Sequence, residues 1–140
     1  MNQVLPHSLW LGHAGEARDF RALFGAGIQA VVDLAAEEPP SQPPRELIYC
    51  RFPVVDGEGN PYELLRLAVD TVAALFRAQV PTLVLCSMGM SRAPAVAAAA
   101  LALVRQERPE KCLEEVLAHH PSDVSPGLWR EVDQLVASRG

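Results

Sequence analysis

The residues best suited to chemistry lie in one short loop that contains Cys86 and Arg92. The segment 82–85 before it predicts a buried strand, and the segment 93–106 after it predicts a helix that is apolar on nearly every side. A loop in this position can curl so that successive backbone N–H groups point inward and bind an anion at the helix N-terminus. Those dipoles and the Arg92 guanidinium stabilise a thiolate on Cys86. A nucleophile and an oxyanion site are therefore expected to coincide.

The same loop has the properties of a phosphate cradle. Gly89 permits a tight curve of the backbone, and Arg92 can hold two oxygens of a tetrahedral oxyanion in a bidentate manner. Two methionines flank Gly89 and are expected to pack within the loop. The predicted phosphate-binding residues are Ser87, Met88, Gly89, Met90, Ser91 and Arg92.

The elements that must position this loop alternate along the chain. Hydrophobic periodicity and turn residues predict strands over 4–12, 28–34, 47–55 and 82–85, and helices over 14–24, 62–79, 93–106, 110–119 and 126–138. This alternation predicts a single α/β domain, with a central, mostly parallel sheet of about four to five strands and helices on both faces. Sites in such sheets lie beyond the carboxyl ends of the strands, which points to the residues after Val55 and after Leu85.

The segment Cys86-x5-Arg92, set between a strand and a helix, resembles the signature loop of cysteine-dependent phosphatases. Asp56 lies in a turn-rich segment, 52–60, that resembles the general-acid loop of small dual-specificity protein phosphatases. The resemblance extends over almost the whole chain, so residues 1–140 are expected to form one catalytic domain. It implies that Cys86 attacks phosphorus and forms a phosphocysteine, that Arg92 and the loop N–H groups bind the phosphoryl oxygens, and that Asp56 is the general acid and base. No metal and no other cofactor is implied.

Two positions depart from the family pattern. Leu85 stands where the family usually has His, and Ala93 stands where it usually has Ser or Thr. These changes leave open a second class, a phosphate-binding module with weak turnover. A sulfur-transfer domain also uses a loop cysteine and is a third class, but it needs neither Asp56 upstream nor Gly89 at this place. Asp56 is alternatively a simple turn residue, and Glu58 is a weaker rival for the acid.

The composition of the chain argues against nucleic acids and membranes as partners. The chain has 140 residues, 49% of them hydrophobic and 21% charged, which suits one globular domain. A formal net charge of −5 argues against nucleic-acid binding. The longest uncharged apolar run, 93–104, has 12 residues, fewer than the roughly 20 of a membrane-spanning helix. No signal peptide is visible, so a cytoplasmic protein without membrane contact is expected.

The loop between Cys86 and Arg92 carries no positive charge, whereas sites for inositol phosphates gain from lysines there. A phosphorylated protein or peptide is therefore the expected substrate, and phosphate or vanadate is expected to bind in the loop.

The other cysteines and the histidine pair have simpler interpretations. Three cysteines do not indicate a disulfide framework, and Cys50 and Cys112 are interpreted as core or surface thiols. His119 and His120 are adjacent on a predicted helix and so face different directions, which favours surface histidines over metal ligands.

Overall fold

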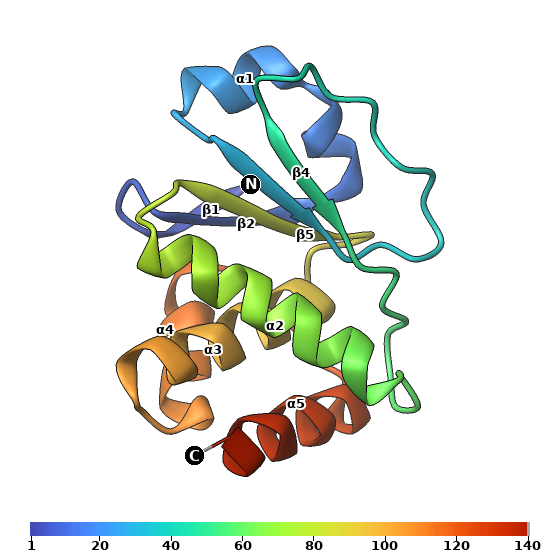
Figure 1. The fold of residues 1–140 in the computed structure, drawn as a ribbon, viewed down its shortest axis with the longest axis vertical. Helices are drawn as coiled ribbons and strands as arrows, with labels where there is room; N and C mark the ends of the chain where they lie inside the picture. Colours follow the sequence, from blue (N-terminus) through green and yellow to red (C-terminus); the bar gives the residue numbers. More distant parts are fainter. Residues whose placement is uncertain (140) are drawn as a thin grey trace.

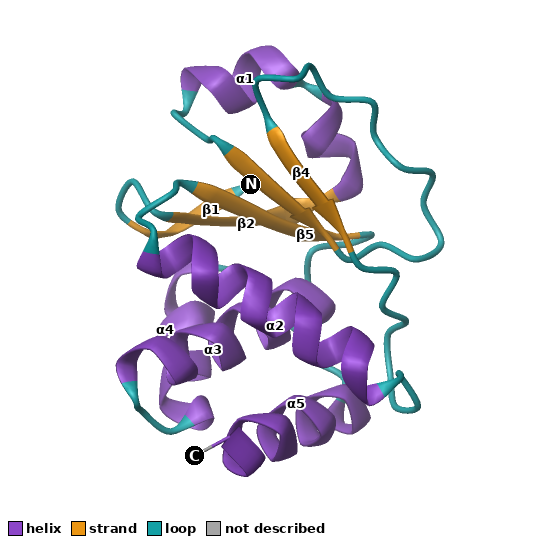
Figure 2. Ribbon diagram, viewed as in Figure 1, coloured by secondary structure: helices purple, strands orange, loops and turns teal. Residues whose placement is uncertain are grey.

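A five-stranded sheet divides the computed structural model, which describes residues 1–139, into two helical layers (Figures 1 and 2). The strands are β1 (Asn2–Leu5), β2 (Leu9–His13), β3 (Ala30–Asp33), β4 (Ile48–Arg51) and β5 (Thr82–Cys86). The helices are the 3-10 helix η1 (Ala14–Arg18), α1 (Phe20–Gly25), α2 (Tyr62–Arg77), α3 (Arg92–Arg105), α4 (Pro109–His119) and α5 (Pro126–Arg139). The predicted α/β class and the helices on both faces are confirmed.

The strand order is β1-β2-β5-β3-β4. Strands β2, β5, β3 and β4 run parallel, and only β1 is antiparallel to its neighbour. Strand β5 is therefore central, with β2 and β3 on either side. Because parallel strands end at the same edge, the residues that follow β3, β4 and β5 meet there.

Side chains of the central strands alternate between two cores. Leu83 and Leu85 of β5 pack with Trp10 and Val31 on the side of η1 and α1. Val84 and Cys86 face the larger core, which the helices α2 to α5 cover. This alternation directs Cys86 toward the N-terminal end of α3 and directs Leu85 away from it.

Helix α3 is the interior element of the large layer. Every residue from Arg92 to Ala102 is buried, and α2, α4 and α5 all pack against it. The prediction of a helix that is apolar on nearly every side is thus explained, because α3 has no face exposed along most of its length. No helix among residues 1–139 has the length and apolar character needed to cross a membrane.

Two predicted elements near the N-terminus were wrong. The strand expected over 4–12 is a hairpin of β1 and β2, closed by a hydrogen bond of 3.1 Å from the Ser8 N–H to the Leu5 carbonyl. Pro6 lacks an N–H and interrupts the ladder at this point. The helix expected over 14–24 is divided into η1 and α1, because the Asp19 side chain accepts the Ala22 N–H at 3.1 Å and caps a new helix.

Candidate active site

Strand β5 delivers Cys86 to the base of a small pocket. The thiol is almost fully buried, at 2% exposure, and Sγ accepts the Ala93 N–H from the first turn of α3 at 3.4 Å. The pocket has a volume of about 190 Å³. Its lining residues are Asp56, Cys86, Met88, Met90, Ser91, Arg92 and Asp123.

The loop between β5 and α3 requires glycine at one position. Gly89 has φ +75°, and a Cβ atom there would lie 2.7 Å from the Gly12 carbonyl oxygen of β2. Both the left-handed backbone and the close approach to β2 exclude a side chain. The predicted tight curve at Gly89 therefore has two physical reasons, of which the second was not visible in the sequence.

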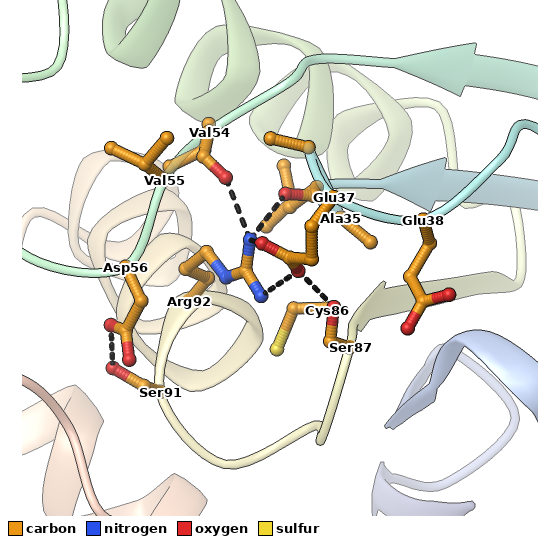
Figure 3. A network of polar contacts seen from close by, with 12 residues as sticks. Ala35, Glu37, Glu38, Val54, Val55, Asp56, Cys86, Ser87, Ser91 and Arg92 are labelled. Carbon is orange, nitrogen blue, oxygen red and sulfur yellow. Dashed lines mark hydrogen bonds and ion pairs between the residues drawn. The ribbon is translucent and has the colours of Figure 1, made fainter.

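Arg92 is held by the segments that follow β3 and β4 (Figure 3). Its Nη1 donates to the Val54 carbonyl at 2.8 Å and to the Leu34 carbonyl at 3.4 Å. The Glu37 carboxylate accepts from Nη2 at 2.5 Å and from Nη1 at 3.1 Å. Burial acts to lower the Arg92 pKa, but the bonds to Glu37 leave that pKa above its ordinary value. The guanidinium is thus a fixed cation at 5% exposure.

Glu37 is a site residue that the sequence analysis missed. Its carboxylate also accepts a hydrogen bond from the Ser87 hydroxyl of the loop, and the bonds to Arg92 hold the Glu37 pKa below its usual value. Sites in such sheets lie beyond the carboxyl ends of the strands, and this holds for the segment after Leu34 as much as for the segments after Val55 and Leu85. Two glutamates, at 37 and 38, follow Leu34, so this rule could have indicated Glu37 as a site residue.

A network at the end of β3 fixes the loop that carries Glu37. The buried Asp33 carboxylate accepts the Ala35 N–H at 2.9 Å and a hydrogen bond from the Tyr49 hydroxyl. Arg51 donates to the carbonyls of Ala35 at 2.9 Å and Glu38 at 2.7 Å. Burial and the bond to Asp33 raise the pKa of Tyr49 to about 12.

The segment that carries Asp56 is closed by the side chain of Asn60. The Asn60 amide accepts the Val55 N–H at 2.9 Å and donates to the Val55 carbonyl at 2.9 Å. The Gly59 N–H donates to Glu131 of α5 at 2.8 Å, which ties the segment to the large layer. Asp56 then meets the loop after β5, because Ser91 Oγ donates to Asp56 Oδ1 at 2.6 Å.

The structure brings most of the predicted site residues together. Cys86, Arg92 and Asp56 line one pocket with Met88, Met90 and Ser91. The Ser87 side chain instead contacts Glu37. Packing of the methionines within the loop was a wrong prediction: Met88 is 75% exposed and Met90 is 40% exposed. They stand at the rim because the loop bends around the pocket and leaves them no core to enter.

The interpretation of the histidine pair holds for one member only. His119 is exposed, whereas His120 is buried at 7% exposure beneath the loop and contacts Asn2 and Gly89. The prediction of a surface His120 was wrong because α4 ends at His119 and the chain turns inward. No cluster of three metal-ligating side chains occurs within residues 1–139.

No protein-family model and no curated protein sequence matches the chain. Several solved structures match the chain. Human DUSP28 superimposes with a TM-score of 0.85 at 26% identity, over 100% of both chains. A mouse dual-specificity phosphatase complexed with zinc tungstate superimposes with a TM-score of 0.85 at 25% identity, over 98% of this chain and 86% of the other. DUSP15 superimposes with a TM-score of 0.82 at 22% identity, over 98% and 87%.

The chain has the fold of a small atypical dual-specificity phosphatase. Within this phosphatase fold the two departures from the family pattern occupy different surroundings. Leu85 is buried among Trp10, Val31 and Leu83 on the far face of β5, so it is a packing residue. Ala93 lies directly beside Cys86 and contributes a backbone donor but no hydroxyl.

Proposed function

We propose that residues 1–140 form a catalytic domain that hydrolyses phosphate monoesters of proteins through a phosphocysteine. The observation that carries this proposal is one pocket lined by a buried thiol, a fixed guanidinium and a carboxylate. Cys86 and Arg92 stand at the two ends of the loop between β5 and α3, and Asp56 comes from the segment between β4 and α2. The dual-specificity phosphatase fold supports the same conclusion, and the mouse phosphatase with zinc tungstate holds an oxyanion that resembles phosphate.

In the first step the Cys86 thiolate attacks phosphorus. An S–P bond forms as the P–O bond to the leaving group breaks, and Asp56 gives its proton to the leaving oxygen. Arg92 and the backbone N–H groups of residues 87–92 stabilise the phosphoryl oxygens.

In the second step water replaces the thiolate. The Asp56 carboxylate takes a proton from water, the water oxygen attacks phosphorus, and the S–P bond breaks with the electron pair returning to Cys86. Inorganic phosphate leaves and Asp56 is again protonated. The Ala93 N–H, 3.4 Å from Sγ, stabilises the departing thiolate.

The proposed substrate is a phosphotyrosine, phosphoserine or phosphothreonine side chain of a protein or peptide. Within residues 1–139, Arg92 is the one cation that lines the pocket, and Asp56 and Asp123 add two carboxylates. A headgroup with several phosphates would meet repulsion at this rim. A volume of about 190 Å³ suits one phosphoryl group and the first atoms of its ester. The proposed compartment is the cytoplasm, where a catalytic thiol stays reduced.

The test is hydrolysis of an aryl phosphate by the wild type, Cys86→Ser and the control Cys50→Ser. Cys50 lies in β4 and does not line the pocket. We expect Cys86→Ser to lose turnover and keep its thermal unfolding temperature, and Cys50→Ser to retain activity. Equal activity of Cys86→Ser and the wild type contradicts the proposal.

One observation favours a second function, an interaction module that binds phosphate and scarcely turns over. Glu37 occupies both terminal nitrogens of Arg92, which a phosphoryl group would otherwise use. If the chain is an interaction module, we expect tungstate binding, measured by calorimetry, without hydrolysis of any aryl phosphate. If it is a phosphatase, we expect both tungstate binding and hydrolysis.

A further inference from the structure

The connection between α4 and α5 contacts backbone carbonyls of the loop that follows Cys86. His120, at the end of α4, lies with Nε2 2.5 Å from the Gly89 carbonyl oxygen and Nδ1 2.9 Å from the Asn2 side-chain nitrogen. Three residues further on, the Asp123 N–H donates to the Met90 carbonyl at 2.7 Å. Two successive carbonyls of the loop are thus engaged from the side of this connection.

The two partners of His120 indicate which ring nitrogen donates and which accepts. A carbonyl oxygen only accepts, so Nε2 carries the hydrogen and donates to Gly89. The Asn2 amide nitrogen only donates, so Nδ1 is the acceptor. Both ring nitrogens have partners, and the ring is fixed between β1 and the loop.

The bond to Gly89 also determines where the next N–H points. The peptide bonds of the described chain are trans, and in a trans peptide the C=O and the following N–H point in opposite directions. With the Gly89 carbonyl turned to His120, the Met90 N–H is directed to the other side of the loop. Met90 lines the pocket that contains Cys86, and His120 does not line it.

The orientation of this peptide needs such a restraint. Gly89, at φ +75°, has access to more of backbone space than any other residue type, so the peptide that follows it rotates easily. A rotated peptide would place the Gly89 carbonyl oxygen toward the pocket, where it repels phosphoryl oxygens. Burial of His120 at 7% exposure holds the donor in place against that rotation.

We propose that His120 is a positioning residue for the phosphate cradle. Its Nε2–H holds the Gly89 carbonyl outside the cradle and so keeps the Met90 N–H available to the phosphoryl oxygens. The inference rests on the proposed function, because it concerns the oxyanion that the pocket binds.

The test uses tungstate as the probe, with affinity measured by calorimetry and amide positions followed by ¹H–¹⁵N NMR. His120→Phe preserves a planar ring but removes the donor, and His120→Gln restores a donor. The exposed neighbour His119→Ala is the matched control. The loss expected in His120→Phe is the hydrogen bond from the Met90 N–H to the tungstate anion. A hydrogen bond to a charged acceptor contributes about tenfold or more in affinity, so we expect His120→Phe to bind tungstate about tenfold more weakly. His120→Gln should stay within about threefold of the wild type on the same scale.

The Met90 amide supplies a readout that a purely structural role would not move. Its resonance should shift on tungstate addition in the wild type and His119→Ala, and should not shift in His120→Phe. Equal tungstate affinity of His120→Phe, His120→Gln and the wild type overturns the role of His120 while leaving the cradle intact. If the wild type itself binds no tungstate, the proposed function fails and this inference fails with it.

Discussion

The Ser91 hydroxyl joins the two segments that the proposed chemistry needs. It donates to Asp56 Oδ1 at 2.6 Å and accepts the Ser125 N–H at 2.9 Å. The hydroxyl has a single hydrogen, and its acceptor is the Asp56 carboxylate, so the hydrogen is directed at Asp56. One side chain of the cysteine loop thus fixes the carboxylate, and the start of α5 fixes that side chain.

Ser91→Ala should therefore impair acid catalysis more than phosphate binding. Asp56 is protonated and neutral when it acts as the acid, so the loss of this hydrogen bond is worth about 1 kcal/mol. We therefore expect kcat for alkyl phosphates to fall roughly fivefold. Activated aryl phosphates, whose leaving groups need no proton, should be affected less. A series of esters with graded leaving groups measures the difference, with Asp56→Asn giving the larger limiting loss. Uniform losses across the series in Asp56→Asn would remove Asp56 from the acid role, and uniform losses in Ser91→Ala would mean that Ser91 does not act through Asp56. Ser138→Ala, in α5, is the control.

Glu37→Gln should tighten binding of a phosphate-like anion. The variant keeps a side-chain oxygen for Arg92 and Ser87 but removes a negative charge from the cradle, so tungstate should bind about threefold tighter near pH 7. Since the Glu37 pKa lies below its ordinary value of 4.5, the carboxylate is ionised and the gain should persist from neutral to mildly acidic pH. Glu38→Gln is the matched control, because only the Glu38 backbone takes part in the network. Weaker binding by Glu37→Gln would mean that the carboxylate chiefly orients Arg92.

Ala93→Ser should accelerate breakdown of the phosphocysteine. Ala93 is fully buried beside Cys86, and a hydroxyl there adds a donor to the departing thiolate, worth roughly tenfold or more in rate. The wild type should release a burst of phenol from an aryl phosphate before a slow steady state. In Ala93→Ser the steady rate should rise and the burst rate should stay the same. The equally buried Ala95→Ser is the control; an unchanged steady rate in Ala93→Ser would place the slow step elsewhere.

Tyr49 should make stability fall at alkaline pH. Burial and the bond to Asp33 raise its pKa to about 12 from an ordinary value of 10.0. A group whose pKa is raised by folding stabilises the protein fully below the unfolded value, and that contribution disappears as pH rises through the folded value. Urea unfolding should therefore show a declining free energy between about pH 10 and 12. Tyr49→Phe should decline less steeply, whereas the exposed Tyr62→Phe should follow the wild type. Parallel curves for Tyr49→Phe and the wild type would contradict the assignment.

The parts of the site that the sequence predicts are those determined locally. A β-branched apolar strand, a glycine and a long apolar helix locate the loop between Cys86 and Arg92, and the turn cluster after Val55 locates Asp56. Helices α2 to α5 begin and end within two residues of their predicted limits, because their periodicity and terminal residues are strong signals.

The parts that the sequence does not predict depend on tertiary contacts. Glu37 lies in a loop with no period of its own, and only its place at the carboxyl edge of β3 brings it to Arg92. His120 is one residue beyond α4, where helical spacing no longer indicates direction. Met88 and Met90 have the character of core residues, but the curve of the loop turns them outward.

The identity of the nucleophile is tested most directly by trapping the intermediate. The wild type is mixed with an aryl phosphate, quenched in acid during the burst, digested and mapped by mass spectrometry. A phosphocysteine mechanism at Cys86 predicts a phosphoryl group on the peptide that contains Cys86, and none on the peptides that contain Cys50 or Cys112. A phosphoryl group on any other residue, or turnover that persists in Cys86→Ser, would contradict it.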